Sequence, residues 1–323
     1  MDTVRVSVVQ DSAVVFDREA TVDKVRHLAR RAAEEGSTLV LFPEAFVSGY
    51  PKGLDFGARV GLRLPEGRED FRRYFDSAVE VPGEATAAMG EAARENGIYL
   101  VVGVIERDGG TLYCSVLFFS PQGELMGKHR KLMPTAAERL VWGFGDGSTM
   151  PVFSTPLGKL GAVICWENYM PLLRVHMYGK GVQLYCAPTA DDRDTWLSLV
   201  RTIALEGRCF VLSCCQYLLR RDCPEDYDAI QGNEPDTVLM RGGSSIVAPT
   251  GEVLAGPNFE GPCILTADLD RNEITRWKYD FDVVGHYARP DVFRLYVNER
   301  PAPAVVTVTG EPGDPFESGV GES

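Results

Sequence analysis

The stretch Gly161-Ala162-Val163-Ile164-Cys165-Trp166-Glu167-Asn168 carries the strongest indication of both fold and chemistry. Small and apolar residues, as expected in a buried strand, run directly into a cysteine and then into a Trp-Glu-Asn turn. A sharp turn from a strand into a helix exposes the side chain at its apex and aims backbone N–H groups towards it. The stretch therefore predicts a cysteine nucleophile at a strand end of an α/β sheet, where active sites of such sheets gather.

A second stretch, Phe42-Pro43-Glu44-Ala45-Phe46, places a carboxylate directly after the apolar run 38–42. Hydrophobic residues flank Glu44 on both sides, so partial burial would raise its pKa and make it a usable base. A helix cap or a buried ion pair explains the same pattern equally well, because structural ion pairs also perturb carboxylates.

A third stretch, Lys128-His129-Arg130-Lys131-Leu132, contains a lysine held near apolar surface by the Leu132-Met133-Pro134 that follows it. Lys128 and Arg130 are better interpreted as a basic surface run, and His129, among three cations, is a poor base for a cysteine-protease dyad. At about 4 Å and an effective dielectric of about 20, a charge pair is worth about 4 kcal/mol. Lys131 is therefore expected to favour the thiolate form of Cys165, the form that attacks an electrophile.

In the rest of the chain, short apolar runs that are typical of strands alternate with segments whose apolar residues have helical spacing. Helices are predicted at 21–34, 84–96, 171–179 and 195–206, and strands at 4–10, 38–42, 98–105, 111–119, 159–164, 182–187, 208–215, 244–249 and 262–268. Residues 51–82 are predicted as loop with a short helix, and 219–240 as a long polar loop. Because hairpins are interspersed with strand–helix units, the pattern favours one large domain with mixed sheets in an α/β layered fold.

Composition narrows the class of protein. The 323 residues have a net charge of −13, which disfavours nucleic acid and anionic membrane surfaces as partners. No apolar run approaches the ~20 residues of a membrane span, and a secretory h-region is not evident near the N-terminus. The eight cysteines and four histidines lack the close spacing of a zinc site. We therefore expect free thiols, no metal and a cytoplasmic location.

Taken together, the three stretches resemble the nitrilase branch of the carbon–nitrogen hydrolase superfamily, in the order Glu, Lys, Cys. Shorter matches extend the resemblance over about residues 4–297, among them Gly49-Tyr50-Pro51, Glu138-Arg139, Trp142-Gly143, Ala187-Pro188-Thr189 and Arg241-Gly242-Gly243-Ser244. The resemblance implies a four-layer α-β-β-α sandwich over residues 1–298, with a loose or assembly-forming C-terminal tail over 299–323. It also implies no cofactor, and a homo-oligomer that is a dimer or a larger spiral.

By motif position, the resemblance implies a catalytic triad of Glu44, Lys131 and Cys165. Glu138 matches a second acidic residue that supports the triad, and the backbone N–H of Trp166 is expected in an anion hole. Tyr50, Trp142, Trp166 and Thr189 adjoin these motifs and are candidates for a substrate pocket, although ordinary core packing explains the aromatic residues equally well.

The implied activity is hydrolysis of an organic nitrile to a carboxylic acid and ammonia through a covalent cysteine thioimidate and thioester. An amidase or carbamoylase, or a nitrile or cyanide hydratase, would use the same triad and remains an alternative. A non-catalytic member of the superfamily is a further alternative, against which the presence of all three triad residues counts.

Overall fold

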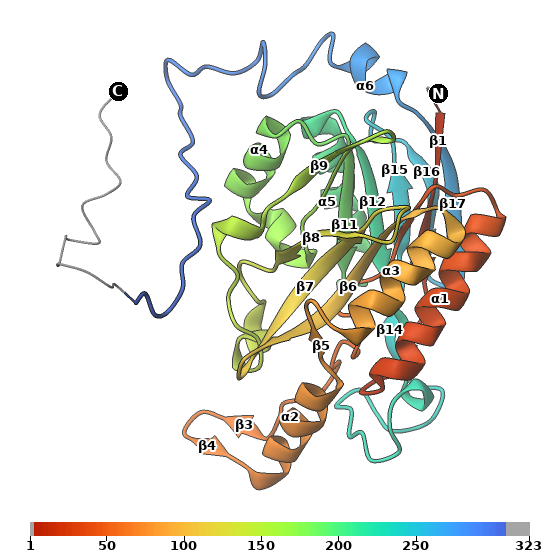
Figure 1. Ribbon diagram of the computed structural model, residues 1–323, viewed down its shortest axis with the longest axis vertical. Helices are drawn as coiled ribbons and strands as arrows, with labels where there is room; N and C mark the ends of the chain where they lie inside the picture. Colours follow the sequence, from red (N-terminus) through yellow and green to blue (C-terminus); the bar gives the residue numbers. More distant parts are fainter. Residues whose placement is uncertain (1–2, 308–323) are drawn as a thin grey trace.

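The apolar strands form two β-sheets that pack face to face (Figure 1). The structure, a computed structural model, describes residues 3–307. The first sheet has the order β17-β1-β2-β6-β7-β8, with β5 beside β6. Its strands are β1 (Thr3–Gln10), β2 (Leu39–Leu41), β5 (Val79–Glu80), β6 (Tyr99–Asp108), β7 (Thr111–Phe119), β8 (Leu125–Arg130) and β17 (Cys263–Asp270).

The second sheet has the order β16-β15-β12-β11-β10-β9. Its strands are β9 (Val152–Thr155), β10 (Gly158–Ala162), β11 (Leu184–Thr189), β12 (Phe210–Cys215), β15 (Ser244–Val247) and β16 (Val253–Asn258). Both sheets are mixed, because parallel pairs such as β1–β2 and β10–β11 lie beside antiparallel pairs such as β6–β7. This arrangement confirms the prediction of strand–helix units with interspersed hairpins.

Helices cover the outer face of each sheet (Figure 1). Helices α1 (Arg18–Glu34) and α3 (Glu84–Asn96) pack on the first sheet through one apolar cluster, and α4 (Pro171–Gly179) and α5 (Asp194–Gly207) pack on the second through another. A third cluster, which includes Val8 and Leu41 of the first sheet and Leu160 and Leu212 of the second, fills the space between the sheets. The layers therefore run α-β-β-α, as the resemblance implied.

Smaller elements lie at the edges of the sandwich. They are the hairpin β3 (Ala58–Arg59) and β4 (Leu62–Arg63), helix α2 (Pro65–Ser77), the pair β13 (Tyr217–Leu219) and β14 (Val238–Arg241), helix α6 (Asn272–Trp277), and the 3₁₀ turns η1 (Ala136–Leu140), η2 (Gly147–Thr149), η3 (Cys165–Tyr169) and η4 (Arg220–Asp222). Residues 51–82 thus contain more regular structure than predicted. The length of helix α2 was missed because the helix has few buried residues, so that its sequence resembles a charged loop.

The interpretation of Lys128 and Arg130 as a basic surface run was wrong. Both lie in β8, which was not predicted as a strand, and both pair with the carboxylate of Glu106, which is 1% exposed. Arg130 also lies over the ring of Tyr113, at 4.1 Å from the guanidinium carbon to the ring centroid. Strand β8 lies at the edge of the first sheet and its charged side chains form ion pairs. It therefore lacks the alternation of apolar and polar residues that usually identifies a strand.

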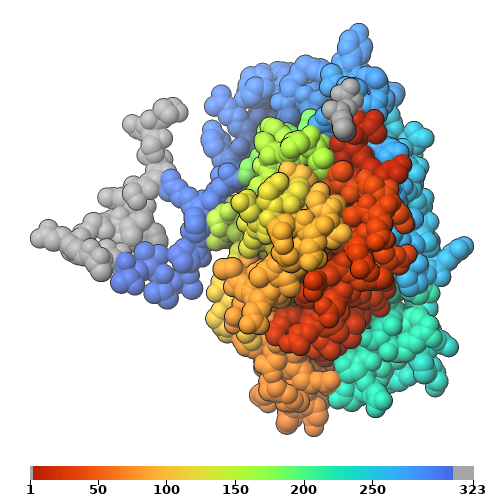
Figure 2. Space-filling view, turned by 45° about the vertical axis from the view of Figure 1, so that its right-hand side comes forward, coloured from red at the N-terminus to blue at the C-terminus, as the bar shows by residue number. Residues whose placement is uncertain are grey.

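After α6, residues 278–307 form neither helix nor strand. Val283 and Val284 still pack on the outer cluster of the second sheet and Glu299 binds Lys180, whereas the end of the segment projects away from the body (Figures 1 and 2). Several large apolar side chains of this segment are exposed, among them Tyr279, Phe293 and Tyr296. Of the predicted tail 299–323, residues 308–323 lie outside the described residues. Within residues 3–307, none of the helices combines the length and the apolar character needed to cross a membrane.

We expect Gly103→Ala to lower the free energy of unfolding by about 1–3 kcal/mol, because β6 lies directly against the turn that carries Glu44. A Cβ atom at Gly103 would stand 2.1 Å from the carbonyl oxygen of Pro43 and 2.9 Å from the Cα of Glu44. Urea unfolding measures the change. The matched control is Gly110→Ala, where an added Cβ meets nothing within 4 Å. Equal losses in the two variants would contradict the close approach.

Candidate active site

Polar side chains from both sheets meet at one end of the sandwich. Glu44 follows β2 and Lys131 follows β8 in the first sheet, whereas Cys165 follows β10 in the second. The Nζ atom of Lys131 donates hydrogen bonds to Oε1 of Glu44 and Oε2 of Glu138, both at 2.7 Å. The hydroxyl of Thr189, at the end of β11, donates to the sulfur of Cys165 at 3.2 Å. Four of these five residues are at least 96% buried, and the Glu138 side chain is 9% exposed.

The backbone at these positions is bent into conformations that L-residues seldom adopt. Cys165 has φ 49°, Ala45 beside Glu44 has φ 49°, and Ala136 in the turn that carries Glu138 has φ 48°. The side-chain amide of Asn168 donates to the carbonyl oxygens of Val163 at 2.9 Å and Cys165 at 2.8 Å, which holds the elbow closed. Backbone strain of this kind persists only where the surroundings fix it. The sharp strand-to-helix turn predicted at Cys165 is therefore present.

The Lys131 ammonium is held in its charged form by two carboxylates. Burial alone would lower the pKa of Lys131, but Glu44, Cys165 and Glu138 act in the opposite direction and the pKa lies well above its usual value. The ring of Trp142 lies behind the ammonium, 5.4 Å from Nζ to the ring centroid. The Tyr50 hydroxyl donates to the other oxygen of Glu138 at 2.7 Å. The lysine thus remains a fixed cation throughout the physiological pH range.

The protonation state of Cys165 depends on how far the Lys131 charge offsets burial and the neighbouring carboxylate. Burial raises its pKa above the usual value, the Glu44 charge raises it further, and the Lys131 charge opposes both without outweighing them. The Lys131 charge does favour the thiolate, as expected, but burial and the adjacent Glu44 carboxylate outweigh it in the resting protein. The thiol is neutral at rest and needs a base when it attacks.

Glu44 is suited to accept that proton. Its Oε1 is occupied by Lys131, whereas Oε2 is buried and has no hydrogen-bond partner among the described residues. Burial raises the pKa of Glu44, against the opposing charge of Lys131. An unoccupied oxygen on a carboxylate of raised pKa is the arrangement that general-base chemistry requires.

The site opens into a cavity of about 230 Å³. Its lining combines Cys165 and Glu138 with the predicted pocket residues Tyr50 and Trp166. Thr189 contacts the sulfur itself, whereas Trp142, only 2% exposed, lines an adjoining cavity of about 270 Å³ that shares Tyr50 and Glu138. The structure thus brings together Glu44, Lys131, Glu138, Cys165 and Thr189, and places Trp142 one layer behind them.

The rim of the cavity contains residues that sequence reasoning missed. The indole N–H of Trp166 donates to Asp191 at 2.8 Å, and Arg193 binds the same carboxylate while its guanidinium lies 4.9 Å from the Trp166 ring centroid. Lys52 lines both cavities. The charged run 191–194, which begins shortly after the predicted strand 182–187, was the available signal, because side chains near strand ends reach the site.

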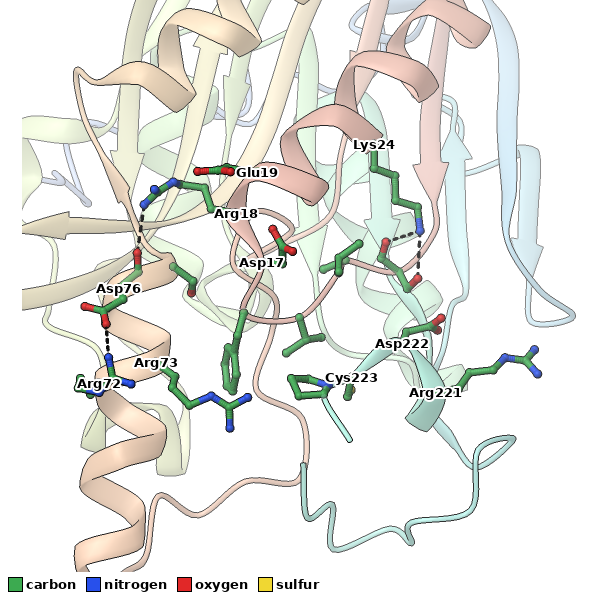
Figure 3. A pocket seen from close by; sticks show the side chains of 17 residues that line it. Asp17, Arg18, Glu19, Lys24, Arg72, Arg73, Asp76, Arg221, Asp222 and Cys223 are labelled. Atoms are coloured by element: carbon green, nitrogen blue, oxygen red, sulfur yellow. Dashed lines mark hydrogen bonds and ion pairs between the residues drawn. The ribbon is translucent and has the colours of Figure 1, made fainter. Parts of the chain in front are cut away.

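A larger cavity of about 780 Å³ lies elsewhere, between the start of α1, the end of α2 and residues 221–224 (Figure 3). Its cations are all engaged: Arg18 with the carbonyl oxygens of Asp76 and Ala78, Lys24 with Asp11, Arg72 with Glu69 and Asp76, Arg73 with Asp226, and Arg221 with Asp236. Size alone therefore does not mark the reactive site. Within residues 3–307, no group of three or more His, Cys, Asp or Glu residues is arranged to hold a metal ion.

Comparisons with known proteins show the family of the chain. The carbon-nitrogen hydrolase family model matches residues 5–279. The chain is 61% identical over 307 residues to the aliphatic nitrilase of Sinorhizobium fredii (strain HH103), covering 95% of this chain and 99% of that protein. It is 56% identical over 304 residues to a bifunctional nitrilase/nitrile hydratase of Lupinus angustifolius, covering 93% and 87%.

Among solved structures, an amidase from Nesterenkonia sp. superposes with a TM-score of 0.64 at 22% identity, over 84% of this chain and 92% of that one. At that identity the likeness shows the fold alone, and it agrees with the four-layer sandwich described above.

We expect Glu44→Gln to lower the pKa of the Cys165 thiol, because the variant removes a negative charge that disfavours the thiolate. The midpoint for alkylation of Cys165 by iodoacetamide should shift to lower pH by about one unit or more. Mass spectrometry of the peptide that contains Cys165 measures the shift. Cys186 is an internal control for folding, because a fully buried thiol should stay unmodified as long as the protein is folded. A midpoint unchanged or moved to higher pH would show that the Glu44 charge does not act on this sulfur.

Proposed function

The chain belongs to the carbon–nitrogen hydrolase family, and on that premise we propose that it is a nitrilase whose nucleophile is Cys165. The observation that supports this most directly is the contact of the buried Lys131 ammonium with two carboxylates, beside a thiol at a strained elbow. The overall reaction converts a nitrile and two waters into a carboxylic acid and ammonia.

In the first step, the sulfur of Cys165 adds to the nitrile carbon and the thiol proton passes to Glu44. A new C–S bond forms, one C–N π bond breaks, and the nitrogen takes the proton from Glu44 to give a thioimidate, which leaves Glu44 ionised again. Negative charge that develops on nitrogen is stabilised by Lys131 and by the backbone N–H of Trp166. A preorganised donor of this kind is often worth about 3 kcal/mol.

In the second step, Glu44 activates a water that adds to the thioimidate carbon. The nitrogen of the resulting tetrahedral species takes a further proton and leaves as ammonia, so that a thioester remains on Cys165. A second water then releases the carboxylic acid, and the sulfur recovers its proton. Glu138 and Tyr50 keep the Lys131 ammonium in place during these steps.

A second candidate function is hydration of the nitrile to the amide. It is favoured by the 56% identity to the relative named as a bifunctional nitrilase/nitrile hydratase. The two outcomes separate at the tetrahedral species, where breaking the C–N bond gives ammonia and breaking the C–S bond gives the amide. An amidase or carbamoylase activity would use the same residues on an amide substrate.

The proposal also includes a homo-oligomer that forms through the segment after α6. Phe293 and Tyr296 in this segment are 80% and 83% exposed, and exposed apolar groups of this size are typical of contact surfaces. We further propose a cytoplasmic location, which is supported by eight cysteines that are all free thiols.

A product assay on a panel of small aliphatic and aromatic nitriles tests the activity. We expect ammonia and acid in equal amounts with little amide, and a loss of at least about a thousandfold in Cys165→Ala with the fold retained. The matched control is Cys186→Ala, a buried thiol on the neighbouring strand. Amide without ammonia would make the protein a hydratase, turnover of amides alone would make it an amidase, and full activity of Cys165→Ala would exclude the proposed nucleophile.

The double variant Phe293→Ser and Tyr296→Ser tests the assembly. We expect a smaller particle than the wild type in light scattering at equal protein concentration, because the contact surface loses its apolar groups. The melting temperature of the protomer serves as the control for folding. A monomeric wild type, or an unchanged particle size in the variant, would contradict the role of this segment.

A further inference from the structure

Glu167, two residues after Cys165, is a buried carboxylate that the proposed mechanism does not use. The residue is 1% exposed and belongs to the turn η3. Its Oε1 accepts a hydrogen bond from the backbone N–H of Leu132 at 2.6 Å. Its Oε2 accepts one from the backbone N–H of Ile164 at 3.0 Å and lies 2.9 Å from Nε2 of His129. One carboxylate therefore joins the backbone next to Lys131 to the backbone next to Cys165.

The other member of this contact, His129, lies on the inner face of β8. Side chains alternate along a strand, so Lys128 and Arg130 point to the opposite face, where they bind Glu106. His129 and Glu167 are 1% exposed, and water has little access to either. Strand β8 thus carries two buried carboxylate contacts on its opposite faces, of which only the inner one is joined to the elbow.

The surroundings of His129 require a charged imidazolium. Its Nδ1 lies 2.7 Å from the carbonyl oxygen of Thr149, and its Nε2 lies against the Glu167 carboxylate. Both neighbours are acceptors only, so both ring nitrogens must carry a proton. Burial alone would lower the pKa of His129, but the charge and hydrogen bond of Glu167 and the carbonyl of Thr149 raise it overall.

We propose that the His129–Glu167 ion pair is a positioning element that sets the separation between the Lys131 ammonium and the Cys165 sulfur. The inference rests on the proposed function, in which these two groups act on the same nitrile. Lys131 and Cys165 come from different sheets, and β8 and η3 are joined here by a carboxylate that accepts from three donors. A shift of about 1 Å between reacting groups is enough to cost about 100-fold in rate.

The pair also has a defined dependence on pH. Because the folded-state pKa of His129 is raised, the pair contributes its full stability below the ordinary histidine pKa of about 6.5. The contribution is lost as the pH rises through the folded-state pKa. Glu167 from η3 is the titratable group that faces the ring, and the Thr149 carbonyl at the end of η2 is its other polar neighbour. We therefore expect His129 to produce an alkaline limb in the rate profile.

The test compares Glu167→Gln and His129→Gln with Glu106→Gln, the matched control on the opposite face of β8. Each protein is titrated with an irreversible thiol reagent to count the reactive Cys165, and kcat is expressed per titrated site. The rate of Cys165 alkylation, measured by mass spectrometry of its peptide, is a second readout that needs no nitrile turnover. If nitriles are not substrates of the wild type, the proposed function fails while the alkylation rates still test the positioning.

We expect Glu167→Gln to lower kcat per titrated site by about 100-fold, with KM changed by less than about threefold. His129→Gln should remove the alkaline limb and change the Cys165 alkylation rate, whereas Glu106→Gln should lower the melting temperature and leave kcat, KM and the pH profile unchanged. A contrary result would be that Glu167→Gln and His129→Gln each leave kcat per titrated site normal and only lower the number of active molecules. That result would reduce the pair to a structural role and overturn the proposal. An alkaline limb that persists in His129→Gln would equally exclude His129 as its origin.

Discussion

The buried contact of the Lys131 ammonium with Glu44 and Glu138 is the constraint on which the rest of the site depends. Taking charges out of water costs several kcal/mol for each ion, so such a group is tolerated only where its partners are held in place. Glu44 and Lys131 extend from strand ends of the first sheet, whereas Cys165 and Thr189 extend from the second. The complete site therefore exists only when the two sheets are packed together.

Two carboxylates around one ammonium leave an excess of negative charge, which acts together with burial on the protonation state of the thiol. A single lysine beside a cysteine would favour the thiolate. Here burial and Glu44 outweigh Lys131, and the pKa of Cys165 is raised. The nucleophile is then formed only when a base takes its proton during attack, and Glu44 keeps one oxygen without a partner for that purpose. A neutral resting thiol is also less reactive towards adventitious electrophiles.

The local sequence pattern was sufficient to predict helices of ordinary periodicity and the site residues that stand directly at the end of an apolar strand. The helices at 84–96 and 171–179 have the predicted bounds, and Glu44 and Cys165 stand at the ends of apolar runs. Pattern failed where stability comes from contacts distant in sequence. The neutral state of Cys165 depends on charges from another sheet, and the fixation of Trp166 depends on Asp191, which is 25 residues away.

Strand β8 shows most directly why the remaining features could not be predicted. The last three residues of β8, which are Lys128, His129 and Arg130, and the Lys131 that follows them form a run of cationic side chains. Such a run ordinarily indicates a solvated surface. The structure instead directs Lys128 and Arg130 to the buried carboxylate of Glu106 on one face and His129 to Glu167 on the other. Lys131, which follows the strand, binds Glu44 and Glu138. Successive side chains of β8 do point to opposite faces, as in any strand. The last three are all cationic here, however, so the alternation is one of ion-pair partners and not of apolar and polar residues. The carboxylates that pair with β8 lie at least 22 residues away in both cases, so the local sequence contains the cations, whereas only the fold brings the carboxylates to them.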